Sequence, residues 1–202
     1  MRLRLLLSQS VLTIIMKQIK TRMENEYINT MLISASKVKS YGLLNLNVDD
    51  SVVSSAIRIA QNVYLVDVIG VDLVHRLQQL VYNKIKGQPD TIDDSGNTAY
   101  KTLLDEYVTD VLAYKTASET VVPNTLKQRN FGTVQNADTN VRDASVSDAR
   151  YLRDYLETSF NHYLNRMSEF LCENKGAFPE YTFDCGCEPN VKYGNIGLWL
   201  GD

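Results

Sequence analysis

Histidine, cysteine and proline are scarce in this chain of 202 residues, which holds two, three and four of them respectively. Neither His75 nor His162 has a partner that the sequence would place beside it, as a general base beside a nucleophile requires. A glycine-rich phosphate-binding loop of the kind that opens nucleotide sites is also missing. No run of 18 apolar residues occurs, so we expect no membrane span. Together these absences predict a protein that is not an enzyme.

The three cysteines, Cys172, Cys185 and Cys187, lie in one stretch near the end of the chain. An odd, clustered set does not build a secreted disulfide framework and indicates a reducing compartment. Structural zinc normally takes four ligands, commonly from C-x2-C pairs, which this stretch lacks. The neighbouring Asp184 and Glu188 would raise the pKa of the adjacent thiols, which argues against a reactive thiolate. We therefore interpret the thiols as inert and expect no metal and no cofactor.

Positive charge is in slight deficit, with a net charge of −3 and a pI near 5.5, which excludes a nucleic-acid binder driven by bulk charge. Residues 1–22 are the exception, because they carry basic side chains and no acid. Such a segment can lie on a membrane, on nucleic acid or against an acidic protein. A poorly packed leader upstream of the natural start is the alternative; a secretory signal is not favoured, because polar residues break the apolar run. The basic residues are Arg2, Arg4, Lys17, Lys20 and Arg22.

Apolar residues recur at helical spacing over most of the remaining sequence. Ser34 or Ser36 is expected to cap a short helix that Gly42 ends. A second helix opens with Asn47, Asp49 and Asp50, which suit a helix N-terminus, and stops at Gly70. Its predicted buried positions are Val52, Val53, Ala56, Ile59, Ala60, Val63 and Tyr64.

Three further helices follow the same pattern. The first ends before Gly87, the next is ended by Pro123, and the last begins near Ser145 or Ser147 and runs to Asn174, about 40 Å at 1.5 Å per residue. The predicted buried positions of the first are Leu73, Val74, Leu77, Leu80, Val81 and Ile85. Those of the next are Tyr100, Leu103, Leu104, Tyr107, Val108, Val111 and Leu112. Those of the last are Ala149, Leu152, Leu156, Phe160, Tyr163, Met167, Phe170 and Leu171.

Two segments depart from this helical pattern. Residues 124–145 are polar, and they hold a stretch with Asn130 and Gly132 near its middle and β-compatible residues on both sides, which predicts an external loop or a small hairpin. Residues 176–202 hold half of the ten glycines, five aromatic residues and the only tryptophan. We expect an extended arm that docks its aromatic side chains on its own bundle or on a neighbour. The sequence thus predicts an all-α bundle of four to five helices: a basic leader or arm over 1–31, a helical domain over 32–175 and a docking arm over 176–202.

Three stretches of the sequence occur together in a characteristic order. They are "NLNVDDSVVSSAIRIAQNVYLVDVIGVDLVHRLQQLV" after a short helix, "LKQRNFGTVQ", and "SDARYLRDYLETSFNHYLNRMSEFLCENKGAFPEY". In this combination the chain resembles the head–tail connector (adaptor, ring or neck) proteins of tailed bacteriophages, in the versions from Bacteroidetes phages and crAss-like phages. The resemblance covers about residues 32–181, and none of the three stretches is a catalytic signature.

The resemblance implies a structural virion protein, made in the bacterial host cytoplasm and located at the head–tail junction. Its subunits would form a homo-oligomeric ring, commonly a dodecamer, that docks below the portal protein and contacts other neck or tail ring proteins. The ring would extend the channel through which double-stranded DNA passes without specific binding. A near-neutral or acidic lining suits that role, because strong phosphate binding would oppose ejection.

On this hypothesis the connection at 124–140 and the arm bind neighbouring subunits, the portal or the tail. The candidate interface residues are Arg129, Asn130 and Phe131 in the connection and Phe178, Tyr181 and Trp199 in the arm, since arginine and buried aromatic anchors dominate interface energetics. The alternative is a nucleic-acid-associated or membrane-associated helical protein that acts through the basic residues at the start of the chain.

Overall fold

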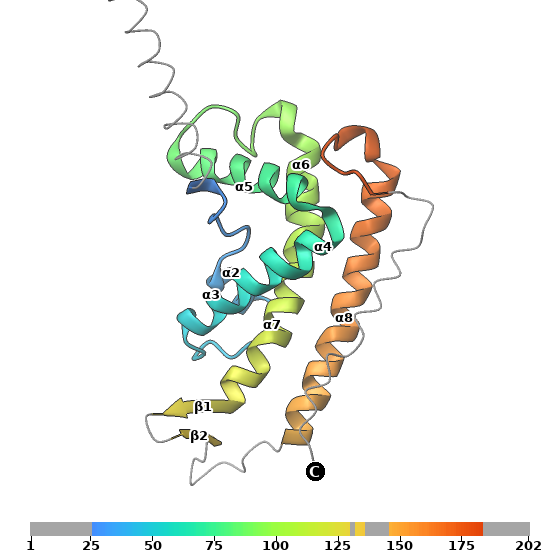
Figure 1. Ribbon diagram of the computed structural model, residues 1–202. Coiled ribbons are helices and arrows are strands. Elements are labelled where there is room, and N and C mark those ends of the chain that lie inside the picture. The colour runs from blue at the N-terminus through green and yellow to red at the C-terminus, as the bar shows by residue number, and fades with distance from the viewer. Residues whose placement is uncertain (1–25, 130–131, 136–145, 184–202) are drawn as a thin grey trace, which may run out of the picture.

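Five helices form the framework of the protein in a computed structural model that describes residues 26–129, 132–135 and 146–183 (Figure 1). Two of the five pass through a π-helical turn without ending. The helices are α2 Ala35–Ser40; α3 Asp50–Ile59, continued by a π turn at Ala60–Leu65 into α4 Val66–Ile69; α5 Val71–Lys86; α6 Thr98–Leu103, continued by a π turn at Leu104–Val108 into α7 Thr109–Thr125; and α8 Val146–Glu173. The predicted all-α bundle is confirmed.

The long helices α7 and α8 run antiparallel and side by side, and the helix formed by α3 and α4 crosses α7 (Figure 1). At 28 residues, α8 is about 42 Å long. The chain leaves α7 at one end of this pair and leaves α8 at the other. The two segments that follow these helices therefore lie at opposite ends of the bundle.

Helix ends follow the sequence signals closely. Ser34 caps α2, because its side chain accepts from the backbone N–H of Lys37, and Asp49 caps α3 through the N–H of Ser51. Gly70 and Gly87 have positive φ angles of 83° and 64°, which glycine adopts without steric cost. The cap expected at Ser34 or Ser36, the start at Asp49 and the breaks at both glycines are confirmed.

One cluster of apolar side chains, drawn from all five helices and from the segment after α8, forms the core. The positions predicted for the helix after residue 98 are buried or half-buried as expected. Four predicted core positions were wrong, because these side chains are 44 to 68% exposed: Ile59, Val63, Ile85 and Leu152. Gln61, Leu65 and Val68 are buried instead in the second half of the α3–α4 helix.

The π turn at Ala60–Leu65 explains the error at Val63, whereas Ile59 precedes the turn and lies beside the buried stripe of Val53, Ala56 and Ile57. A π turn holds one residue more than an α turn, so every later side chain is rotated relative to a regular 3.6-residue repeat. Extrapolating the stripe of Val53 and Ala56 at constant period points Val63 inward, whereas the added residue turns Leu65 to the core. Composition gives no warning of such a turn.

Two buried glutamines hold the irregular segment at residues 28–32. Gln61 is 2% exposed and accepts a hydrogen bond from the backbone N–H of Leu32 at 2.8 Å. Gln78 is 1% exposed, and its amide donates to the backbone carbonyl of Ile28 at 2.7 Å. Buried backbone groups outside regular structure need such partners. The two side chains therefore determine where the chain enters the bundle.

For the connection between α7 and α8 the sequence predicted an external loop or a small hairpin, and the structure contains the hairpin. Strand β1, Leu126–Arg129, pairs antiparallel with β2, Gly132–Gln135, with Leu126 opposite Gln135 and Arg129 opposite Gly132. Pro123 does not end the preceding helix as predicted, since α7 continues to Thr125. A proline in the last turn removes only one backbone donor, so the helix can run on for two residues.

Candidate interaction surfaces

The segment after α8 packs onto the end of the bundle. Phe178 has no exposed surface, and its ring lies edge-to-face against Tyr100 at 5.3 Å and against Phe170 at 6.0 Å between centroids. Tyr181 is 7% exposed and belongs to the same core. The sequence left open whether the arm docks on its own bundle or on a neighbour. Phe178 and Tyr181 dock on their own bundle. In this structure Phe178 leaves no surface for a partner.

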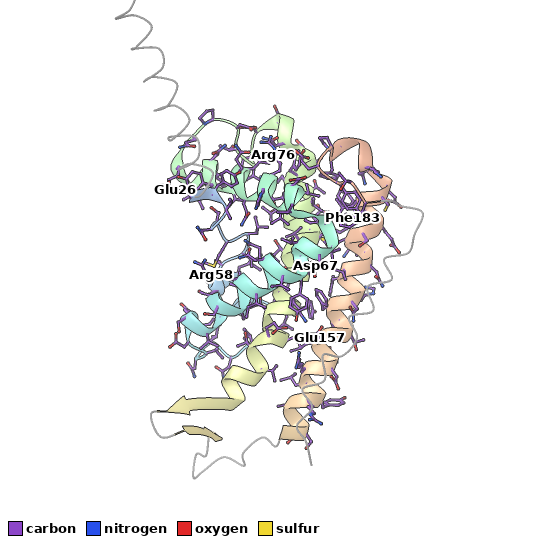
Figure 2. The ribbon with its side chains drawn as sticks, viewed as in Figure 1. Glu26, Arg58, Asp67, Arg76, Glu157 and Phe183 are labelled. Carbon is purple, nitrogen blue, oxygen red and sulfur yellow. The ribbon has the colours of Figure 1, made fainter. Side chains whose placement is uncertain are left out.

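A polar cluster fastens this segment to α5 and α6. The hydroxyl of Tyr100 donates to Glu180 at 2.7 Å, and Arg76 Nε lies 4.0 Å from Glu180 Oε1. Arg76 also donates to Asp90 Oδ2 at 2.9 Å, and its guanidinium lies 5.6 Å from the centre of the Tyr100 ring. Figure 2 shows Arg76 at this end of the bundle, as it does Phe183, where the described segment ends. The cluster joins three segments far apart in sequence.

The contact between Tyr100 and Glu180 should make the stability of the protein depend on pH in the alkaline range. Burial, and then the hydrogen bond to Glu180, raises the pKa of Tyr100 to about 12. Above pH 10 an unfolded tyrosine releases its proton while Tyr100 keeps it, so stability should fall as pH rises from about 10 to about 12. Urea unfolding of the Tyr100→Phe variant should show a shallower decline than the wild type; equal slopes would contradict this prediction. Burial also raises the pKa of Tyr41, so part of the decline should remain.

The candidate residues of the connection belong to the opposite end of the bundle. Arg129 is the last residue of β1. Asn130 and Phe131, between the strands, and Trp199, in the arm, lie outside the described residues. The described candidates therefore do not lie on one surface, because β1, which ends at Arg129, and the segment after α8, which holds Phe178 and Tyr181, lie at opposite ends of the bundle (Figure 1).

The first turns of α8 carry exposed apolar surface that sequence reasoning missed. Tyr151 is 79% exposed, Leu152 is 46% exposed and Tyr155 is 60% exposed. Leu156, which directly follows Tyr155, and Phe160, about one turn later, are buried against the bundle. Clustered exposed side chains of this size are a common mark of contact surfaces. The helical repeat could not reveal them, because it predicts that Leu152 is buried and does not indicate a contact surface at Tyr151 and Tyr155.

A buried lysine lies at the centre of the junction between α7, α8 and the π turn after α3. The Lys115 side chain is 4% exposed, and its Nζ lies 2.6 Å from Glu157 Oε1 and 3.2 Å from Glu119 Oε1. The same atom is 3.7 Å from the centre of the Tyr64 ring and 5.2 Å from that of Phe160. Figure 2 shows Glu157 on the side of α8 that faces α7. One cation is shared by two carboxylates, so the cluster carries a net negative charge.

An open pocket of about 310 Å³ adjoins this cluster, between α3 and α7. We call it the α3–α7 groove. Its lining residues are Ser51, Val52, Ser55, Ala56, Ile59 and Glu119. Five of the six come from one face of α3, and Glu119 is the acidic member contributed by α7. The groove thus combines apolar walls with one carboxylate.

The remaining candidates for chemistry that lie in the described residues make packing contacts. Cys172 is half-buried and packs against the core, as expected for an apolar filler, whereas Cys185 and Cys187 lie outside the described residues. His75 lies edge-to-face on Tyr27, with 6.1 Å between ring centroids. Within residues 26–129, 132–135 and 146–183, no three His, Cys, Asp or Glu side chains gather as a metal site would require.

One helix in the described ranges, Asp50–Ile69, is long and apolar enough to cross a membrane by length and composition, with a mean hydropathy of 1.3. Of its most apolar window, 44% is buried inside the bundle. A core helix passes the same test, so this single helix is weak evidence for a span.

The sequence matches the model of a protein family. A model described as "Family of unknown function (DUF6712)" matches residues 65–191, well over half of the sequence. The chain belongs to this family. The matched range of DUF6712 includes Lys115, Glu119, Glu157 and the segment after α8, whereas all of α3 and the segment held by Gln61 precede it. Searches of curated proteins and of solved structures found no match.

Proposed function

We propose that this protein is a structural component of a phage virion: the subunit of a ring that docks below the portal, extends the DNA channel and joins head to tail. The observation that carries the proposal is the ordered set of three sequence stretches that resemble head–tail connectors. These stretches fall on α3 to α5, on the hairpin, and on α8 with the segment that packs after it. They therefore include three of the five helices and the segments at both ends of the bundle, but not the helix formed by α6 and α7.

The placement of the two non-helical segments supports a ring. A closed ring of identical subunits needs two different surfaces on each subunit, because each contact is head-to-tail. The β1–β2 hairpin lies at one end of the α7–α8 pair, and the described segment that follows α8, up to Phe183, lies at the other end (Figure 1). A partner or neighbour at either end would meet a separate element of the chain.

The charge of the chain is compatible with a DNA channel that lets DNA slide. Strong binding to phosphates requires many lysine and arginine contacts, and its strength falls steeply with salt. The net charge of −3 provides no such excess. The alternative, a protein that binds nucleic acid or membrane through residues 1–22, has the five basic residues of that segment in its favour.

The experiment that tests the proposal is removal of the arm after Phe183. The cut has to follow Phe183, because removal from residue 176 onward would also delete the core side chains Phe178 and Tyr181. We expect the full chain to form rings by negative-stain microscopy and light scattering. The chain 1–183 should keep the helical circular dichroism of the full chain but assemble poorly.

Normal rings from the chain 1–183 would remove the arm from the proposal. A full chain that stays monomeric at its highest soluble concentration, and that binds DNA or liposomes only while residues 1–22 are present, would favour the alternative. The variant Leu46→Ala serves as a control for surface changes, because this side chain is 74% exposed and belongs to none of the candidate surfaces.

A further inference from the structure

An apolar stripe on α3 and on the π turn that continues it extends the α3–α7 groove. Ile59, which lines the groove, is 44% exposed, and Val63, one turn further along the helix, is 50% exposed. Residues three or four positions apart lie next to each other on one helix face. The stripe therefore runs from Val52 to Val63, about 17 Å along the axis. Soluble proteins rarely leave such a surface uncovered without a binding role.

The groove is acidic as well as apolar. Glu119 lines it, and Glu157 lies across Lys115 from Glu119 in the same cluster. Lys115 alone balances two carboxylates, which leaves one negative charge in excess. An occupant that is apolar on one side and positively charged on another would match the groove in both respects.

The first 22 residues of this chain have that composition. They carry five basic side chains and no acid, and eleven of the remainder are Leu, Ile, Val or Met. Even as a helix they would measure about 33 Å, longer than the exposed stripe. We propose that residues 1–22 of one subunit bind the α3–α7 groove of a neighbouring subunit. This contact would join neighbouring subunits of the proposed ring, so the inference rests on the proposed function.

The entry point of the chain favours a neighbouring subunit over the same one. Gln61 holds the segment that leads from residues 1–22 into the bundle, since it binds the backbone of Leu32. Ile59, only two positions earlier, lines the groove. Side chains two positions apart on a helix point to nearly opposite sides. The described chain at Thr30 and Leu32 therefore meets α3 on the side away from the groove, and this favours the groove of a neighbouring subunit over the subunit's own groove.

The test uses the full chain with the stripe made cationic. In the variant Ile59→Lys/Val63→Lys, two exposed apolar contacts are lost and the groove repels a basic segment. We expect sedimentation velocity to show self-association weakened by about tenfold or more, with unchanged circular dichroism. The matched control is Leu46→Lys/Ile85→Lys, which adds the same charge at exposed apolar positions, 74% and 68% exposed, outside the groove. This control should associate as the wild type does.

Complementation identifies the two partners of the contact. The chain 23–202 keeps the groove but lacks the basic segment, and the Ile59→Lys/Val63→Lys chain keeps the segment but lacks the groove. Each by itself should associate weakly. Their mixture should form a one-to-one heterodimer, because one segment can meet one intact groove. A mixture that associates no better than its components would overturn the proposal.

Other outcomes separate this contact from the ring itself. If the Ile59→Lys/Val63→Lys variant forms rings as the wild type does, the groove contact is refuted while the ring stands. If its only change is faster tryptic cleavage at Lys20 in the monomer, the segment occupies its own groove and the proposal is wrong. If the wild type does not associate at all, both the ring and the contact fail.

Discussion

Replacing Lys115 with methionine should lower the free energy of unfolding by about 3 kcal/mol, because removal of one partner leaves buried charges without a counter-ion. The value lies at the low end of the range for buried ion pairs. The side chains of Glu119 and Glu157 remain 18% and 26% exposed, so water can partly replace the ammonium. Methionine keeps most of the aliphatic stem, so the lost packing is small. Urea unfolding followed by circular dichroism measures the change.

Two further variants show whether the loss comes from the shared charge. Lys101→Met breaks the ion pair with Asp93, which is open to solvent, and should leave the unfolding curve nearly unchanged. Lys115→Met combined with Glu157→Gln should cost clearly less than the sum of the two single changes, because the pair acts as one unit. Additive effects, or a loss at Lys115 no greater than that at Lys101, would show that the cluster is only loosely coupled.

The features that sequence reasoning predicted correctly are those that a few neighbouring residues determine. Asp49 caps α3 through an N–H two residues away, and Gly87 ends α5 by adopting a positive φ angle. The buried stripe from Leu103 to Leu112 repeats with helical spacing and packs as the spacing requires. Such signals are local, so the rest of the chain does not need to be known.

The features that it missed depend on residues far apart in the sequence. Gln61 and Gln78 are buried because the backbone near residue 30 needs hydrogen-bond partners, which no window around either glutamine reveals. Lys115 is a charged residue, which a helical pattern assigns to solvent, and it is buried only because Glu157, 42 positions later, meets it. The candidate surfaces were missed for the same reason.

Composition does not determine whether the arm docks on its own bundle or on a neighbour. Its aromatic residues indicate docking, but the same side chains suit an internal core or a neighbour. The structure uses Phe178 and Tyr181 internally, where they complete the end of the bundle beside Tyr100 and Phe170. The part of the arm available to a partner therefore begins after Phe183, and the proposed function depends on that shorter segment.

Phe178→Ala should release this end of the chain before it unfolds the bundle. Removing a buried phenylalanine side chain costs about 3–5 kcal/mol. The segment after α8 is held mainly by Phe178, Tyr181 and the Glu180 cluster, so most of that cost should fall on its docking. Lys175, exposed at the start of the segment, then provides a site for trypsin. Cleavage there should be faster by about a hundredfold or more, since cleavage tracks the open population when opening is fast.

The control for this prediction is Phe183→Ala. Its ring is 42% exposed, so its loss should change cleavage at Lys175 only slightly. Urea unfolding distinguishes release from global collapse. If Phe178→Ala lowers the unfolding midpoint strongly and leaves the cleavage rate at Lys175 unchanged, the segment is inseparable from the bundle. Release of the segment would instead mean that residues 174–183 can detach while the bundle stays folded. When docked, this segment fixes the start of the arm at a defined place on each subunit.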